Sequence, residues 1–203
     1  MKLNALLSGV LLATAFTTAS ALSVVSGNVP QDDSNLVRNP CGLPAGSATG
    51  LLVRGCLNDD HSVNVFLASD EELSISGGQA TLTATDGSLS MLSIAMAGMD
   101  TLILNIDANA DGFVTFTDGI QTSAPFALDD AGENFFTITG IDSNFVRFET
   151  TVNGVETDIV DEVRQIRLGG QAVSPVPEPE TYALMMAGLI ALGFISRRRK
   201  TRK

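Results

Sequence analysis

The sequence predicts a mainly β protein: an antiparallel β-sandwich or jelly-roll-like ectodomain, preceded by a signal peptide and followed by a single transmembrane helix. Short segments rich in Thr, Val, Ile and Phe, with largely alternating apolar and polar positions, recur along residues 51–170. Clusters of Gly, Asp and Asn separate them, and no sustained helical stripe precedes the far C-terminus. Short strands at this spacing favour two packed antiparallel sheets.

Residues 1–21 have the pattern of a secretory signal peptide. Met1 and Lys2 give a positive start, residues 3–16 carry no charge and are mostly apolar, and Ala19 and Ala21 flank Ser20 in a small-x-small pattern. We therefore expect export by a Sec-type machinery and cleavage by signal peptidase after Ala21. The alternative is a buried N-terminal helix.

Residues 22–50, rich in Asn, Asp, Pro, Ser and Gly, are expected to form an irregular lead-in. Cys41 and Cys56 are the two cysteines of the chain, and in an exported protein a disulfide between them is the default. Such a bond would stabilise the fold by about 3 kcal/mol. A metal site is the alternative, but His61 is the only histidine and zinc sites need four clustered donors.

Within the expected β-sandwich, residues 51–170, the alternation and the turn clusters predict eight strands. The stretch 89–99 is ambiguous, because a helical turn also fits its C-terminal half. The predicted strands are 63–67, 80–84, 89–97, 101–106, 113–116, 134–139, 145–151 and 163–168.

The region between the two ends is strongly acidic. Residues 22–176 hold 21 acidic residues and five arginines, a net charge near −16, against −11 for the whole chain. Nucleic acid is therefore an unsuitable partner, since phosphate binding requires clustered Lys and Arg.

The C-terminal region has three parts after a linker at 171–176. A Pro-Glu-Pro segment at 177–181 comes first, and an uncharged stretch and a basic tail at 197–203 follow it. As a helix, residues 181–196 would be about 24 Å long, short for a hydrocarbon core of about 30 Å but sufficient with local thinning and snorkelling arginines. The positive-inside rule keeps the basic tail in the cytoplasm and the ectodomain outside.

These three parts together, residues 177–203, resemble the PEP-CTERM sorting signal, also catalogued as an ice-binding protein C-terminal domain. The resemblance implies that Pro177, Glu178 and Pro179 are the motif that an exosortase recognises. Residues 182–195 would then hold the protein transiently in the inner membrane, and Arg197, Arg198, Arg199 and Lys200 would stop transfer. Cleavage near the motif would release the ectodomain to the cell surface or the medium. Glu180 departs from the small residue that is usual there, and a permanently anchored single-pass protein is the alternative.

A second resemblance covers the middle of the chain. Segments 133–140, 145–148 and 161–170 are similar to ectodomains often found upstream of this signal. Those ectodomains are β-rich and mostly of unassigned function, so this resemblance bears on the fold alone.

Residues 107–118 have the spacing of a calcium-binding loop. Asp107, Asn109, Asp111 and Asp118 occupy positions one, three, five and twelve, with glycine at position six. A plain hairpin turn between two strands is the other interpretation, since Asp, Asn and Gly also suit such turns. Asp129, Asp130 and Glu133 form a second acidic turn.

No nucleophile elbow, phosphate-binding glycine loop or Cys–His pair occurs in the sequence. His61 lies beside two aspartates but has no sequence-adjacent nucleophile pattern. We therefore expect a non-enzymatic surface or extracellular protein, associated with an exopolysaccharide or biofilm matrix. We expect no cofactor, unless the loop at 107–118 binds Ca²⁺. The alternatives are a calcium-dependent carbohydrate-binding or adhesive module and a secreted hydrolase.

Overall fold

The computed structural model describes residues 21–44 and 48–170. Within them the chain forms one 3-10 turn, η1 (Asn39–Cys41), and thirteen strands, which confirms the mainly β prediction. The strands are β1 (Ser23–Ser26), β2 (Asp33–Val37), β3 (Thr49–Leu57), β4 (Asn64–Ser76), β5 (Thr81–Ala84), β6 (Met91–Met96), β7 (Thr101–Ala108), β8 (Gly112–Thr117), β9 (Phe126–Leu128), β10 (Asn134–Thr139), β11 (Phe145–Val152), β12 (Val155–Glu156) and β13 (Val160–Gly169).

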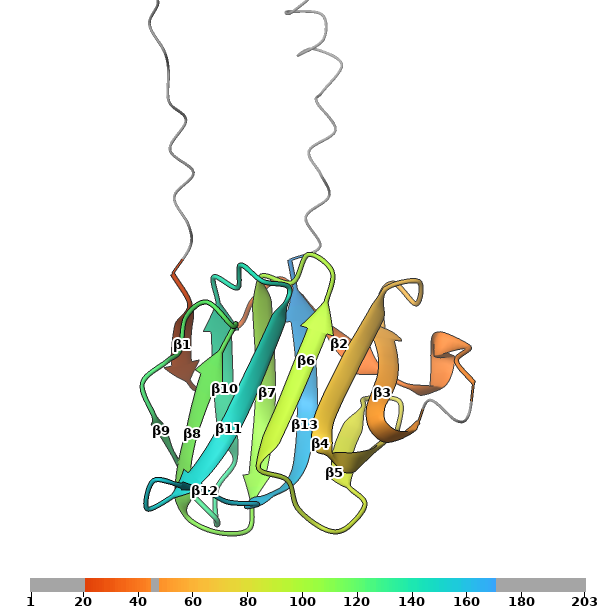
Figure 1. Ribbon diagram of the computed structural model, residues 1–203. Coiled ribbons are helices and arrows are strands. Elements are labelled where there is room, and N and C mark those ends of the chain that lie inside the picture. The colour runs from red at the N-terminus through yellow and green to blue at the C-terminus, as the bar shows by residue number, and fades with distance from the viewer. Residues whose placement is uncertain (1–20, 45–47, 171–203) are drawn as a thin grey trace, which may run out of the picture.

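The strands form one antiparallel sheet in the order β1-β10-β7-β13-β2-β3-β4-β6-β11-β8-β9. Figure 1 shows the sheet folded over itself, with β10, β7, β13 and β2 behind β8, β11, β6 and β4. We call these the back layer and the front layer. Two connections join the layers on one side, because β2 pairs with β3 and β5 pairs with both β13 and β4.

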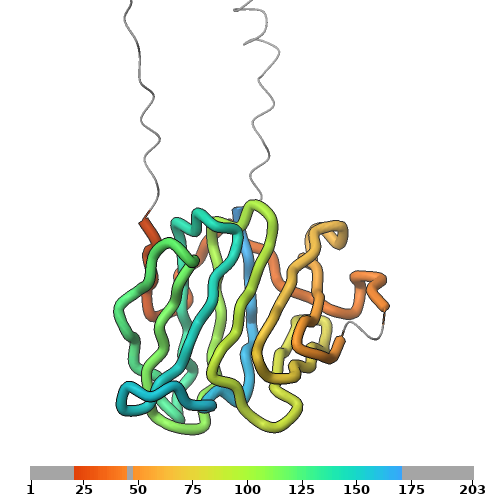
Figure 2. Tube along the Cα trace, in the orientation of Figure 1, coloured from red at the N-terminus to blue at the C-terminus, as the bar shows by residue number. Residues whose placement is uncertain are grey.

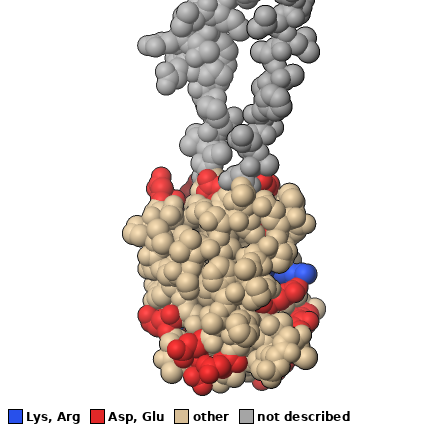
Figure 3. Space-filling view, turned by 90° about the vertical axis from the view of Figure 1, so that its left-hand side faces the viewer, with Lys and Arg blue, Asp and Glu red and all other residues tan. Residues whose placement is uncertain are grey.

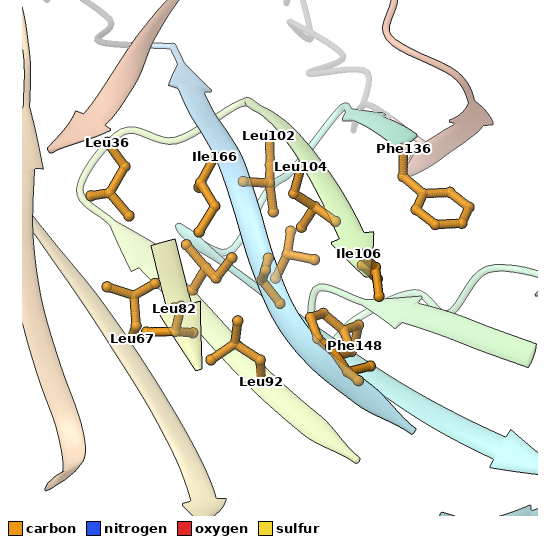
Figure 4. Close-up of a cluster of buried hydrophobic side chains, with 14 of the residues drawn as sticks. Leu36, Leu67, Leu82, Leu92, Leu102, Leu104, Ile106, Phe136, Phe148 and Ile166 are labelled. Atoms are coloured by element: carbon orange, nitrogen blue, oxygen red, sulfur yellow. The ribbon is translucent and has the colours of Figure 1, made fainter. Parts of the chain in front are cut away.

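Alternation of side chains along the strands produces the core between the layers. In β6, Leu92, Ile94 and Met96 are buried while the residues between them are partly exposed, as expected for a strand with one covered face. Phe116 of β8 and Phe136 of β10 meet across the layers with ring centroids 5.0 Å apart. Figure 4 shows buried side chains from both layers converging in this core.

The predicted strands at 134–139 and 145–151 coincide with β10 and β11 to within one residue. The strand expected at 63–67 is longer in the structure, since β4 continues to Ser76. Asp70, Glu71 and Glu72 interrupt its apolar pattern, yet Leu73 and Ile75 return to the core beyond them. The ambiguous stretch 89–99 is a strand as far as Met96 and then turns.

The expectation that residues 22–50 form an irregular lead-in was wrong. β1 pairs with β10, β2 pairs with β13 and β3, and β3 itself begins at Thr49. β1 and β2 are four and five residues long, too short to display a period of two, and their partners β10 and β13 lie far away in the sequence. Long-range pairing, rather than local pattern, makes these residues strands.

The segment between β1 and β2, residues 27–32, connects opposite sides of the back layer across its outer surface. Gly27 donates its N–H to the carbonyl oxygen of Phe135 at 2.7 Å, and Val29 donates its N–H to the hydroxyl of Thr137 at 3.0 Å. Arg167 of β13 donates to the side-chain oxygen of Asn28. The N-terminal residues therefore fix strands that occur more than 100 positions later in the chain.

The predicted disulfide between Cys41 and Cys56 is confirmed, with the two Cα atoms 5.7 Å apart. It ties the turn η1 to β3, where Cys56 is fully buried. The bond therefore stabilises a short polar segment that has few apolar side chains of its own.

Both ends of the described chain lie at the same end of the fold. Figures 1 and 2 show β1 beginning and β13 finishing on that side, which we call the proximal end; the opposite side is the distal end. No helix in the described residues is long and apolar enough to cross a membrane. The predicted span at 181–196 lies outside them, as do residues 1–20 and the C-terminal motif and tail.

Candidate functional site

The four residues of the predicted calcium loop are not brought together. Asp107 is the second-last residue of β7 and pairs with Arg164, with Oδ2 and Nη2 3.3 Å apart, while Asn109 donates to Asp161 at 2.6 Å. Asp111 precedes β8 and Asp118 follows it, so the two residues lie about 23 Å apart at about 3.3 Å per residue.

The alternative of a plain hairpin turn was wrong. β7 pairs with β10 and β13, whereas β8 pairs with β11 and β9. The short connection at 109–111 therefore carries the chain from the back layer to the front layer.

Asp118 shapes a turn instead. Its side chain is fully buried, and its Oδ1 accepts the N–H groups of Ile120 at 2.9 Å and Gln121 at 2.7 Å. Burial acts to raise the pKa of Asp118, but hydrogen bonds from the backbone N–H groups of Gln121, Ile120 and Asp142 outweigh it, so this pKa lies below its ordinary value. The carboxylate thus fixes the turn after β8 as an anion.

A different carboxylate group does converge, at the distal end. Oxygens of Asp111, Asp129 and Asp130 lie within 4.8 Å of one another, and all three side chains are exposed. Asp111 accepts the N–H of Asp130 at 3.2 Å, and Asp129 accepts the N–H of Ala131 at 2.9 Å. Three hard oxygen donors at this spacing suit a divalent cation such as Ca²⁺.

Strand register explains why these residues meet. Gly112, the first residue of β8, pairs with Leu128, the last residue of β9. Asp111, just before Gly112, and Asp129, just after Leu128, therefore lie side by side. The sequence shows both acidic turns, but their contact follows only from this pairing.

The distal end as a whole is acidic. Figure 3 shows Asp and Glu side chains gathered there on the face that it presents. Glu71 belongs to a second distal group, with Asp70, Asp86 and Asp158. A hydrogen bond with the Asp86 carboxyl, together with repulsion from the other carboxylates of this group, raises the pKa of Glu71. This end attracts cations and repels anionic polymers.

Two hollows lie away from the distal carboxylates. One, of about 550 Å³, is at the proximal end and carries five aspartates, Asp32, Asp33, Asp59, Asp60 and Asp100. The other, of about 370 Å³, is on the outer surface of the front layer and mixes an aromatic ring, hydroxyl groups and an ion pair. Neither hollow could be predicted from the sequence, because each draws its residues from segments that are distant in the chain.

His61 is exposed in the loop between β3 and β4. The hydroxyl of Ser62 donates to Asp60 at 2.6 Å, and the side-chain and backbone hydrogen bonds from Ser62 lower the pKa of Asp60. Asp60 therefore holds its own loop through Ser62.

Of the residues predicted to act in export and sorting, Ala21 is described and exposed. Leu22, next along the chain, packs partly buried against the core and donates its N–H to the side chain of Gln121 at 3.2 Å. Ala19, Pro177, Glu178, Pro179, Arg197, Arg198, Arg199 and Lys200 lie outside the described residues.

The family model of the PEP-CTERM protein-sorting motif matches residues 175–200. The match contains the Pro-Glu-Pro motif, the uncharged stretch and the first part of the basic tail. No curated protein and no solved structure matches the chain.

Proposed function

Because this chain is a PEP-CTERM sorting domain-containing protein, we propose that it is a non-enzymatic surface protein that an exosortase releases into an exopolysaccharide matrix. Signal peptidase and a Sec-type machinery export it, and residues 182–195 hold it transiently in the inner membrane. Cleavage near Pro177, Glu178 and Pro179 then frees the ectodomain. The sorting motif at 175–200 is the observation that carries this proposal.

Three features of the ectodomain support this route. Leu22 already packs against the core, so signal-peptide cleavage after Ala21 leaves the domain intact. The disulfide between Cys41 and Cys56 suits an oxidising compartment. Both ends of the domain lie on one side (Figure 1), so a membrane tether at either end leaves the distal end pointing outward.

We also infer a jelly-roll arrangement for the ectodomain. One set of four strands runs in the order β5-β13-β7-β10, and a second set runs in the order β6-β11-β8-β9. Consecutive strands of the chain alternate between the two sets from β5 to β8, as in a sheet pair wound from Greek keys. β1 to β4 extend this frame.

The intact mass of the protein recovered from its host tests the sorting step. We expect a chain beginning at Leu22 and ending within 177–181, found at the surface or in the medium. A mass that still includes Lys203, found only in the inner membrane, would contradict release and favour the permanent anchor.

Matrix association has its own test. We expect the released protein to sediment with purified matrix polysaccharide and to show no turnover of glycan, ester or peptide substrates. Robust hydrolysis by the pure protein would overturn the non-enzymatic assignment. Absence from the polysaccharide fraction would remove the matrix role but leave sorting intact.

A cation-dependent adhesive role is the second candidate, favoured by the convergence of Asp111, Asp129 and Asp130. Calorimetry with Ca²⁺ tests it, with Asp129→Asn as the variant and Glu133→Gln as the control of equal charge change. The candidate predicts millimolar or tighter binding that Asp129→Asn abolishes and Glu133→Gln retains. Absence of binding to the wild-type protein would eliminate it.

A further inference from the structure

The outer surface of the front layer is a continuous field of side chains held on paired strands. One row across it contains Arg54, Phe66, Ala95 and Phe145, which are neighbours through the pairing of β3, β4, β6 and β11. These side chains alternate with buried ones along each strand, so they face away from the core. Arg147 lies two residues after Phe145 on the same face of β11. This surface therefore has an arginine near a phenylalanine at each side: Arg54 with Phe66, and Arg147 with Phe145.

Of these two places on the surface, the one at Phe145 and Arg147 lines a hollow. Near β8 and β11 a cavity of about 370 Å³ is lined by Thr115, Thr117, Thr122, Phe145, Arg147 and Glu149, with Gly119 at its edge. The volume lies in the range of small-molecule sites. Arg54 and Phe66 line none of the hollows described above, although the Arg54 guanidinium lies 5.1 Å from the Phe66 ring centre.

The floor of the hollow offers paired donors and acceptors. Arg147 and Glu149 form an ion pair with Nη2 and Oε1 2.5 Å apart, and their side chains are 43% and 40% exposed. Thr117 lies across from Arg147 and Thr115 across from Glu149 on β8. A planar guanidinium beside a carboxylate can donate to one hydroxyl of a sugar and accept from the next.

The aromatic wall is held rigidly in place. A Cβ on Gly119 would lie 2.7 Å from the tip of the Phe145 ring, and Gly119 has a φ of +84°, so the turn backbone packs directly against the ring. Asp118 fixes the same turn through its two backbone hydrogen bonds. The hollow is thus formed before any ligand arrives, which reduces the entropy lost on binding.

Charge and backbone pairing narrow the class of ligand. The charges of Arg147 and Glu149 cancel, while residues 22–176 as a whole carry a net charge near −16, so an anionic polymer is repelled. β11 and β8 both have partners on each side, so their backbone groups cannot pair with an extended peptide. Hydroxyl groups and an apolar ring face remain as the matching chemistry.

We propose that this hollow, the front groove, binds a segment of a neutral polysaccharide through Phe145, Arg147 and Glu149. The proposal rests on the matrix role proposed above and names the ligand class and its site. Phe145 packs against an apolar sugar face, and the ion pair and neighbouring threonines contact the hydroxyl groups.

Nuclear magnetic resonance on ¹⁵N-labelled protein recovered from its host tests the groove directly. The Nε–H signals of Arg147 and Arg54 serve as probe and internal control, since both Nε atoms are buried and neither has a hydrogen-bond partner among the described residues. The ligands are maltohexaose, cellohexaose, laminarihexaose, mannohexaose and the neutral polysaccharide of the host matrix. We expect at least one to shift Arg147 and leave Arg54 unchanged. No shift of Arg147 by any of them would overturn the proposal.

Matched variants test the energetic role. Phe145→Ala and the double change Arg147→Gln with Glu149→Gln should each weaken polysaccharide binding about tenfold or more, whereas Phe66→Ala and Arg54→Gln should not weaken it. Unchanged amide spectra elsewhere establish that each variant is folded. Equal binding by Phe145→Ala and wild type would place the ligand outside the groove. In that case co-sedimentation with matrix polysaccharide would still support the matrix role, so the two failures are distinguishable.

Discussion

Replacing Asp118 by alanine should strongly destabilise the ectodomain. The change removes a buried acceptor of two backbone hydrogen bonds, at 2.9 Å from Ile120 and 2.7 Å from Gln121. Hydrogen bonds to a charged group contribute about 1.5–3 kcal/mol each. Ile120 is 72% exposed, so water can replace its lost partner more readily than that of Gln121. Allowing for the desolvation of the lost carboxylate, we expect the free energy of unfolding to fall by about 2–4 kcal/mol.

The dependence on pH has a definite sign. The pKa of folded Asp118 lies below its ordinary value of 3.8, so the folded state binds this proton more weakly than the unfolded state. The stabilisation by the Asp118 carboxylate is complete at a pH above its ordinary pKa, and it is lost as the pH falls through the lowered pKa of the folded state. The Asp118→Asn variant retains an acceptor oxygen at this position but has no carboxyl group to titrate, so it should lack that acid-sensitive part of the stability.

Urea unfolding monitored by circular dichroism measures both effects. Glu133→Ala is the control, because Glu133 is an exposed acidic side chain whose loss should change stability by less than about 0.5 kcal/mol. An Asp118→Ala variant that is as stable as Glu133→Ala would refute the role of the two hydrogen bonds. Identical acid profiles of wild type and Asp118→Asn would refute the assigned pKa direction.

Three further predictions concern the remaining fold. The double change Cys41→Ser with Cys56→Ser should lower the free energy of unfolding by about 3 kcal/mol, and reductant should then have no additional effect on the urea midpoint. Phe116→Ala, in the fully buried aromatic cluster, should cost about 3–5 kcal/mol, whereas Phe113→Ala, 47% exposed, should cost far less in the same assay. Glu71→Gln should raise the thermal midpoint near pH 7 by relieving carboxylate repulsion, and a gain that persists at pH 3 would contradict this explanation.

Sequence pattern predicted those parts of the fold where one strand face is clearly apolar. β6, β10 and β11 alternate well and were found in nearly the expected places. β3 was missed because Leu51 and Leu52 are 58% and 55% exposed, so apolar residues occur on both sides of the strand. When apolar residues occur on both faces of a strand, its composition does not reveal which face packs against the core.

The candidate sites could not be predicted from residue spacing within one loop, because their residues meet only through strand pairing. Asp111 and Asp129 meet through the pairing of β8 with β9, and the front groove requires Arg147 to lie across from Thr117. The calcium-loop pattern instead assumed that residues close in sequence share a ligand. Here the chain crosses between layers after Asp107, and β8 carries Asp118 to the other end of the fold.

The central position of β13 determines how the domain bears mechanical load. β13 ends at Gly169, next to the segment that leads to the sorting motif, and it lies between β7 and β2. Hydrogen bonds of antiparallel neighbours run perpendicular to the strands, so tension along β13 shears many bonds at once, whereas an edge strand pulled sideways would unzip bond by bond. Tension applied to the C-terminal end of β13 is therefore resisted on both flanks of the strand, by β7 on one side and by β2 and β5 on the other.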